Sequence, residues 1–159
     1  MKRSNLALCG LMCVALISGA AEEKKGEPEV AGSTELKWLA SIDDAKKEAA
    51  ARKVPILVDF SGSDWCGWCI RLDNEVFSKP AFKEYAGKHL VLLLLDYPRS
   101  KPQTDEVKRQ NRELAEQFGI EGYPTVVLLD ANGKELARTG YQRGGAEAYV
   151  EHLKKLLKQ

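Results

Sequence analysis

Two cysteines three positions apart place the strongest constraint on what this chain can fold into. Cys66 and Cys69 lie in the segment "SDWCGWCIR", and a tryptophan precedes each of them. The two other cysteines, Cys9 and Cys13, lie in an N-terminal segment with the features of a cleaved signal peptide. We therefore expect Cys66 and Cys69 to be the only thiols of the mature chain, so that any intramolecular disulfide joins these two.

The first 20 residues predict a secretory signal peptide. Two basic residues near the start precede the apolar run "LALCGLMCVALI", and small residues follow it up to Ala20. This apolar run is shorter than the roughly 18 residues of a membrane span. We expect cleavage near Ala20, a periplasmic or secreted mature protein, and no stable insertion in a membrane.

The mature chain has a balanced charge. Subtracting Lys2 and Arg3 from the 24 basic residues leaves 22, against 23 acidic residues. This balance does not point to nucleic acid as a partner. Residues 21–34, "AEEKKGEPEVAGST", are polar and contain glycine and proline, which predicts a flexible tether before one domain over residues 35–159.

Helix and strand signals alternate along this domain. Ser41, followed by acidic and later by basic residues, predicts a capped helix over residues 41–53. Continuous apolar runs predict buried strands over residues 54–60 and 89–97. Further helices are predicted over residues 71–77 and 80–88, from Thr104 to about Phe118 with Gly119 as C-cap, and over 146–157.

A hairpin signal completes the pattern. Asn132-Gly133 predicts a tight turn between strands over residues 124–130 and 134–141, while residues 98–103, "PRSKPQ", predict a loop. Strands separated by helices pair in parallel, and the hairpin adds an antiparallel edge. The sequence therefore predicts an α/β fold with a central mixed sheet, helices on both faces and an additional N-terminal helix.

Three of the four roles open to a Cys-x-x-Cys pair fit this chain poorly. A structural disulfide here closes a very small loop and removes little entropy from the unfolded chain. A structural zinc ion needs four ligands, and beyond the cysteines only His89 and His152 offer ring nitrogens. Covalent haem attachment needs a histidine directly after the second cysteine, where this chain has Ile70. We therefore expect no metal and no cofactor.

The fourth role is dithiol–disulfide exchange. If Cys66 is the N-cap of a helix that begins near Gly67, its sulfur meets unpaired backbone N–H groups and the positive end of the helix dipole. This environment favours the thiolate, which is the nucleophile. Cys69, one helical turn later, can reach the same sulfur. We expect Cys66 to attack a partner disulfide and Cys69 to resolve the mixed disulfide.

Two segments resemble the thioredoxin family. "ILVDFSGSDWCGWC" is similar to the family's strand and active-site segment, in which a buried aspartate precedes a Trp-Cys-x-x-Cys motif. "FGIEGYPTVVLLDANGKELARTGY" resembles the second half of that fold, where a cis-proline leads into a strand and hairpin. The resemblance covers residues 40–157 and implies the thioredoxin fold.

The resemblance also implies roles for single residues. Cys66 corresponds to the attacking cysteine and Cys69 to the resolving cysteine. Asp59 corresponds to the buried acid that moves protons for Cys69, and its apolar neighbours favour a burial that raises the pKa of a carboxyl group. Pro124 corresponds to the cis-proline, beside which the backbone of Tyr123 pairs with an extended substrate chain.

Aromatic residues around the cysteines predict contact with a substrate protein. Gly67 and Trp68 form the dipeptide between the cysteines, at the exposed start of a helix. An aromatic face in that position suits apolar contact with a client. We expect Trp65 to pack beside the site.

Three features differ from ordinary thioredoxins. The segment between Asp59 and Cys66 has one extra residue, a length change that can shift Asp59 away from Cys69. The dipeptide is Gly-Trp instead of Gly-Pro or the Gly-His of protein disulfide isomerases, and the loop around residues 98–103 is longer. Together these features favour an exported branch of the family.

We interpret the chain as a thiol-disulfide oxidoreductase for exported proteins, with reduction or isomerisation favoured over oxidation. This direction rests on Asp59 and on the absence of a histidine in the dipeptide. The implied partners are client proteins with disulfides or thiols and a membrane electron-donor protein. The alternatives are a disulfide-donating oxidase and a non-catalytic binding module that presents Trp68 and Tyr123. Copper delivery by the two thiolates is chemically feasible, but no methionine-rich or histidine-rich stretch supports it.

Overall fold

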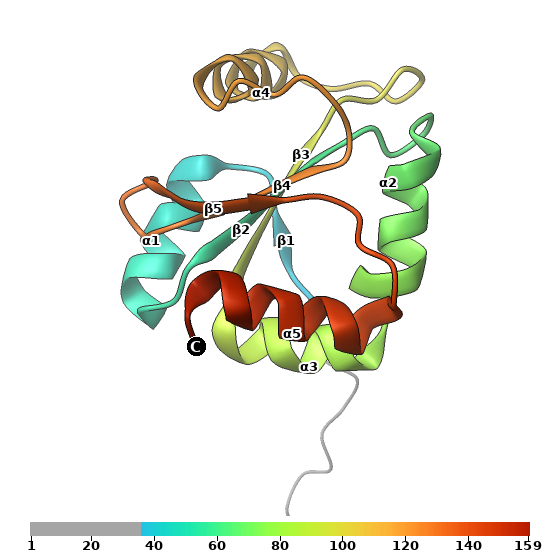
Figure 1. Cartoon of the computed structure of the whole chain (residues 1–159). Helices are drawn as coiled ribbons and strands as arrows, with labels where there is room; N and C mark the ends of the chain where they lie inside the picture. Colours follow the sequence, from blue (N-terminus) through green and yellow to red (C-terminus); the bar gives the residue numbers. More distant parts are fainter. Residues whose placement is uncertain (1–35) are drawn as a thin grey trace, which may run out of the picture. The chain divides into compact units, whose positions relative to one another are not determined.

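Both faces of β2 (Ile56–Ser61) are covered, because all six of its residues are buried. In the computed structural model, which describes residues 36–159, this strand is the centre of a five-stranded mixed sheet (Figure 1). The other strands are β1 (Trp38–Leu39), β3 (Val91–Asp96), β4 (Thr125–Leu129) and β5 (Glu135–Thr139). Their order is β1-β3-β2-β4-β5, with β3 parallel to β1 and β2, and β4 antiparallel to β2 and β5.

Helices cover both faces of the sheet, with α4 on one side of it and α3 and α5 on the other in Figure 1. One layer consists of α1 (Ile42–Arg52) and α4 (Asp105–Gln117), and the other of α2 (Gly67–Leu72), the π-helical turn η1 (Asp73–Phe77), α3 (Pro80–His89) and α5 (Gly145–Leu157). Val58 of β2 belongs to the core under α1 and α4, and Leu57 to the core under α3 and α5. Because side chains alternate along a strand, Asp59 faces the same layer as Leu57, which contains α2.

The helix caps form as the sequence predicts. The Ser41 hydroxyl accepts the Asp44 backbone N–H at 3.3 Å at the start of α1, and the Thr104 hydroxyl accepts the Val107 N–H at 3.3 Å at the start of α4. Gly119 has a φ of +57° just after the end of α4, a left-handed conformation that glycine adopts without a steric penalty. These local signals therefore fix where both helices begin and where α4 ends.

The predicted hairpin between β4 and β5 is confirmed. Gly133 has a φ of +88°, and Asp130 organises the turn by accepting the backbone N–H groups of Asn132 and Lys134 on its carboxylate at 2.8 and 2.9 Å. The pairing register shifts between Leu128 and Leu129, which marks an irregularity next to the turn. The hairpin brings β5 to the edge of the sheet.

Three details differ from the sequence prediction. The two-residue strand β1 was not predicted, because so short a segment carries no periodicity of its own. The helix that begins at Gly67, as predicted, changes to π-helical geometry at Asp73, so the helix expected over residues 71–77 is not a regular α-helix. A helix separates β3 from β4, yet β4 lies beside β2 and antiparallel to it, so parallel pairing of helix-separated strands was the wrong expectation here.

The predicted signal peptide over residues 1–20 and the tether over 21–34 lie outside the described residues. Within residues 36–159, no helix has the length and apolar character that crossing a membrane requires.

Candidate active site

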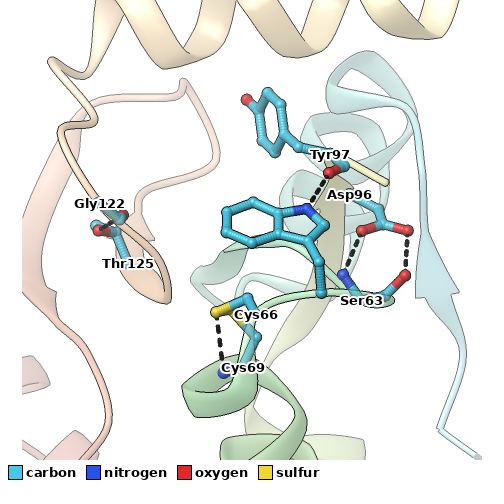
Figure 2. Close-up of a disulfide and its surroundings, with 8 residues drawn as sticks. Ser63, Cys66, Cys69, Asp96, Tyr97, Gly122 and Thr125 are labelled. Atoms are coloured by element: carbon cyan, nitrogen blue, oxygen red, sulfur yellow. Dashed lines mark hydrogen bonds between the residues drawn. A yellow bond between two sulfur atoms is a disulfide. The ribbon is translucent and has the colours of Figure 1, made fainter. Parts of the chain in front are cut away.

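The two cysteines form a disulfide at the start of α2 (Figure 2). Their Cα atoms lie 5.2 Å apart, and the S–S bond measures 2.07 Å. Cys66 is the N-cap of α2, as predicted, and its Sγ accepts the Cys69 backbone N–H at 3.2 Å. Both residues are buried, with 6% of Cys66 and 4% of Cys69 exposed. When the disulfide is reduced, a thiolate at Cys66 meets a backbone donor that stabilises its charge.

Asp59 and Cys69 line the same cavity, which has a volume of about 340 Å³. Polar side chains of Ser61, Asp73 and others contribute to its lining, together with apolar side chains from β1, β3 and η1. The extra residue between Asp59 and Cys66 therefore leaves Asp59 on the cavity that reaches Cys69.

Asp59 carries an unusual carboxyl group. The residue is 5% exposed, and its Oδ1 atom has no hydrogen-bond partner among residues 36–159. Burial is the main reason that the pKa of this carboxyl group is raised from 3.8 to about 7. The negative charges of Asp73 and Asp96 add to the rise, and the Ser61 hydroxyl opposes it. A carboxyl group with this pKa can both accept and return a proton at neutral pH.

Trp65 packs beside the site, where the sequence places it. Its indole N–H donates to the Tyr97 carbonyl at 2.8 Å, and its ring meets Tyr123 edge to face at a centroid distance of 5.7 Å. The Arg99 guanidinium lies 4.2 Å from the centre of the Trp65 ring. A Cβ atom on Gly62 would lie only 2.5 Å from this ring, so the indole occupies space that only glycine leaves free.

Hydrogen bonds tie the segment with the extra residue to the loop after β3. Ser63 donates its backbone N–H and its hydroxyl to the Asp96 carboxylate at 2.9 and 2.6 Å (Figure 2). Asp64 accepts the backbone N–H groups of Arg99 and Ser100 at 3.0 and 2.7 Å. These bonds lower the pKa of the Asp64 carboxyl group, which therefore stays charged. The lengthened active-site segment and the lengthened loop after β3 are therefore connected by direct hydrogen bonds.

Sequence reasoning missed Ser63, Asp64 and Asp96 as contributors to the site. Their one signal in the sequence is that two segments are both longer than in ordinary thioredoxins, namely the active-site segment and the loop after β3. Neither departure alone identifies the contact, since the residues that bond are 33 to 36 positions apart.

The Tyr123–Pro124 peptide bond is cis, as the resemblance implies. Thr125 then begins β4, and its hydroxyl donates to the Gly122 carbonyl at 2.7 Å, which braces the turn before the strand. Figure 2 shows Gly122 and Thr125 on one side of the disulfide, with Ser63 and Asp96 on the other.

The dipeptide between the cysteines faces solvent. Gly67 is exposed, and a Cβ atom there would meet nothing within 4 Å. Trp68 is 51% exposed, and Ile70 on the same short helix is 42% exposed. The aromatic surface that the sequence predicts at this helix start is therefore accessible to a partner.

The described part of the chain contains no cluster of three or more histidine, cysteine, aspartate or glutamate side chains suited to a metal ion. His89 stacks on Tyr85 with a centroid distance of 4.9 Å, and His152 shares a hydrogen bond with Thr139 at 2.9 Å. Both histidines thus have contacts of their own outside the cysteine site.

Comparison with known proteins identifies the family. Residues 42–157 match the family model of a thioredoxin-like domain. The chain is 36% identical over 151 residues to "Disulfide bond reductase DsbH" of Chlamydia pneumoniae, an alignment that covers 95% of this chain and 90% of that protein. It is 31% identical over 108 residues to "Thioredoxin-related protein DsbJ" of the same organism, covering 68% of this chain and 31% of that protein.

A solved structure agrees with these sequence matches. The structure described as "DsbH Oxidoreductase" superposes with a TM-score of 0.75 at 36% identity, covering 84% of this chain and 94% of that chain. The mixed sheet, the helix layers and the Cys-x-x-Cys disulfide at the start of α2 fit this match. The chain therefore belongs to the thioredoxin-like family, has the thioredoxin fold, and is a thiol-disulfide oxidoreductase.

Proposed function

We propose that this protein reduces or isomerises disulfides of exported proteins, with Cys66 as the attacking and Cys69 as the resolving cysteine. The observation that supports these roles best is the hydrogen bond from the Cys69 N–H to the Cys66 sulfur, at the N-cap of α2. A donor aimed at one sulfur favours the thiolate at Cys66, which is the reactive form in disulfide exchange.

The reaction has two exchange steps. First, the Cys66 thiolate attacks one sulfur of the client disulfide, forms a mixed disulfide and releases the other client sulfur as a thiolate. Second, the Cys69 thiol gives up its proton and attacks the Cys66 sulfur, so that the Cys66–Cys69 disulfide forms and the remaining client sulfur leaves. Two electrons pass from the dithiol to the client, and a membrane electron-donor protein returns the enzyme to its dithiol form.

Asp59 is the proposed proton acceptor for Cys69. Both residues line one cavity, and the pKa of Asp59 is raised to about 7, mainly by burial. At neutral pH a large share of the molecules thus holds a carboxylate able to take the proton of Cys69 in the second step. The opposite transfer protonates Cys69 when the enzyme is reduced again.

Two observations favour reduction or isomerisation. The relative that is 36% identical bears the name "Disulfide bond reductase". The dipeptide of this chain also lacks a histidine, which would stabilise the Cys66 thiolate and make the disulfide more oxidising. Isomerisation follows when a second client thiol, instead of Cys69, attacks the mixed disulfide.

The client surface is proposed to combine Trp65, Gly67, Trp68, Tyr123 and Pro124. An extended client segment would pair with the backbone at Tyr123, beside the cis peptide bond. We further propose that residues 1–20 are a signal peptide cleaved near Ala20, that 21–34 form a tether, and that the domain over 35–159 acts in the periplasm or outside the cell.

The reduction potential of the Cys66–Cys69 pair tests this proposal. Equilibration of the protein in defined thiol buffers should give a value of about −270 to −230 mV, the range of reductants that depend on an electron supply. A value near about −120 mV would instead identify a disulfide donor. A variant with both cysteines replaced by alanine separates catalysis from binding, because it should lose all turnover; full cellular function in that variant would favour the non-catalytic binding module.

A further inference from the structure

Trp68 lies between the two cysteines in sequence, and its side chain rests on two neighbours. The Trp68 ring centroid is 5.2 Å from that of Tyr141, at an interplanar angle of 42°. The Arg71 guanidinium lies 5.5 Å from the centre of the Trp68 ring and 5.5 Å from the centre of the Tyr141 ring. Half of Trp68 remains exposed, so the ring is supported on one side and open on another.

A single carboxylate joins the two groups that support Trp68. The Arg71 Nε–H donates to one oxygen of Glu75 at 2.6 Å, and the Tyr141 hydroxyl donates to the other oxygen at 2.5 Å. Arg71 and Glu75 belong to the continuous helix of α2 and η1, whereas Tyr141 lies in the segment between β5 and α5. Glu75 therefore connects the helix that Cys66 caps with a segment 66 residues away.

This set of contacts contributes little to the stability of the fold. The side chains of Arg71 and Glu75 are 52% and 38% exposed, and exposed ion pairs add only a small amount to the free energy of unfolding. The contacts have a larger effect on the position of Trp68. Each oxygen of Glu75 accepts one hydrogen bond, and both donors, Arg71 and Tyr141, contact the Trp68 ring. The hydrogen bonds from Tyr141 and Arg71 also lower the pKa of the Glu75 carboxyl group, which stays charged.

We infer that Glu75 is a positioning residue that fixes the Trp68 ring, through Arg71 and Tyr141, as the contact for the client segment that flanks the attacked disulfide. The inference rests on the proposed function. The occupant it requires is an extended segment with an aliphatic or aromatic side chain next to its cysteine, because the open part of Trp68 offers an apolar face. A ring that is already held in place loses little conformational entropy when the client binds.

The test is a comparison of Glu75→Gln and Tyr141→Phe with the unchanged protein. Glu75→Gln removes the charge that Arg71 binds, and Tyr141→Phe keeps the ring but removes the hydroxyl that reaches Glu75. The matched control is Glu84→Gln, which breaks an exposed pair with Lys88 on α3 that has the same four-residue spacing. The substrates are a peptide with an intramolecular disulfide and a leucine beside one cysteine, and 2-hydroxyethyl disulfide as a small disulfide.

We expect the KM for the peptide to rise by about three- to tenfold in both test variants, because the client must then order the Trp68 side chain itself, and ordering one side chain on binding changes affinity by about this factor. The kcat and the rate with the small disulfide should stay the same, and Glu84→Gln should match the unchanged protein. An unchanged KM in both test variants would overturn the inference, because Glu75 would then have no effect on client binding. An equal loss of rate with both substrates would also overturn it, because Glu75 would then affect the reactivity of the cysteines.

A spectroscopic readout separates this inference from the proposed function. The protein labelled with 5-fluorotryptophan gives one ¹⁹F signal per tryptophan, and the signal of Trp68 is assigned with Trp68→Phe. In Glu75→Gln this signal should shift and gain solvent exposure, while those of Trp38 and Trp65 stay in place. An unmoved Trp68 signal would overturn the positioning role alone. If the unchanged protein reduced only the small disulfide and no peptide, the proposed function and the client contact would both fail.

Discussion

Asp59 and Cys69 share one cavity, although the segment between Asp59 and Cys66 is one residue longer than in ordinary thioredoxins. The extra length is taken up by a turn in which the backbone N–H groups of Trp65 and Cys66 both donate to the Gly62 carbonyl, at 3.2 and 2.8 Å. This turn leaves a buried acid and a cysteine from different elements on the same cavity, which the proposed proton transfer requires.

The first prediction concerns the roles of the two cysteines. Cys69→Ala should accumulate mixed disulfides between Cys66 and client proteins, because the resolving thiol is missing, whereas Cys66→Ala should trap almost none. Non-reducing gels of cells that express each variant, followed by identification of the trapped proteins, make the measurement. Equal trapping by both variants would contradict the assigned roles.

The second prediction concerns proton transfer by Asp59. The rate of the second exchange step should rise with pH through about 7, as the Asp59 carboxyl group loses its proton and becomes able to accept that of Cys69. Asp59→Asn should lose this inflection and be slower by about a hundredfold at pH 7.5, the lower end of the range for general-base catalysis. Stopped-flow fluorescence against pH measures both; an identical profile in the variant would exclude Asp59 from the step.

The third prediction concerns stability. The pKa of Asp59 is higher in the folded protein, about 7, than its ordinary value of 3.8, so the folded state binds more protons between these limits. Stability from this group is fully present below about pH 4 and is lost as the pH rises through about 7. At pH 8, Asp59→Asn should therefore raise the free energy of unfolding by up to about 4 kcal/mol relative to the unchanged protein.

Urea unfolding of the oxidised proteins at pH 4 and pH 8 checks this expectation. The gain from Asp59→Asn should be small at pH 4, where the carboxyl group of the folded protein is already neutral. An equal gain at both pH values would show that charge burial is not its cause.

The fourth prediction concerns Asp73, whose negative charge is the second cause of the raised pKa of Asp59. Asp73→Asn should lower the pKa of Asp59 and move the inflection of the pH profile to a lower pH. Asp105→Asn is the matched control, because Asp105 is an exposed acid at the start of α4. Carboxyl ¹³C chemical shifts of Asp59 measured against pH decide the point, and an equal pKa in both variants would remove Asp73 as a cause.

The fifth prediction concerns Gly62. Gly62→Ala should displace the Trp65 ring, since the new Cβ atom would lie 2.5 Å from it, and should destabilise the protein by about 1–3 kcal/mol. Gly87→Ala is the control, because a Cβ atom there meets nothing within 4 Å and alanine favours a helix by about 0.5–1 kcal/mol. Thermal unfolding of both variants makes the comparison. A Gly62→Ala variant as stable as the unchanged protein would show that the Trp65 ring can move aside without loss of stability.

Features set by neighbouring residues could be predicted from the sequence. The helix cap at Cys66, the burial of Asp59 and the Asn132-Gly133 hairpin each depend on a few adjacent side chains, so their patterns identify them. The cis peptide bond before Pro124 was predicted from the family resemblance alone. The same local signals missed the two-residue strand β1 and the change to π-helical geometry at Asp73, because neither leaves a period in the sequence.

The contacts that complete the site were decided only by the tertiary structure. Ser63 meets Asp96 across 33 residues, and Glu75 meets Tyr141 across 66. The position of β4, antiparallel to β2, likewise depends on the path of the chain after α4. Periodicity and capping determine which face of an element is buried, but which distant side chains meet depends on strand order, register and loop path. These are fixed only when the whole sheet and its two helix layers pack together.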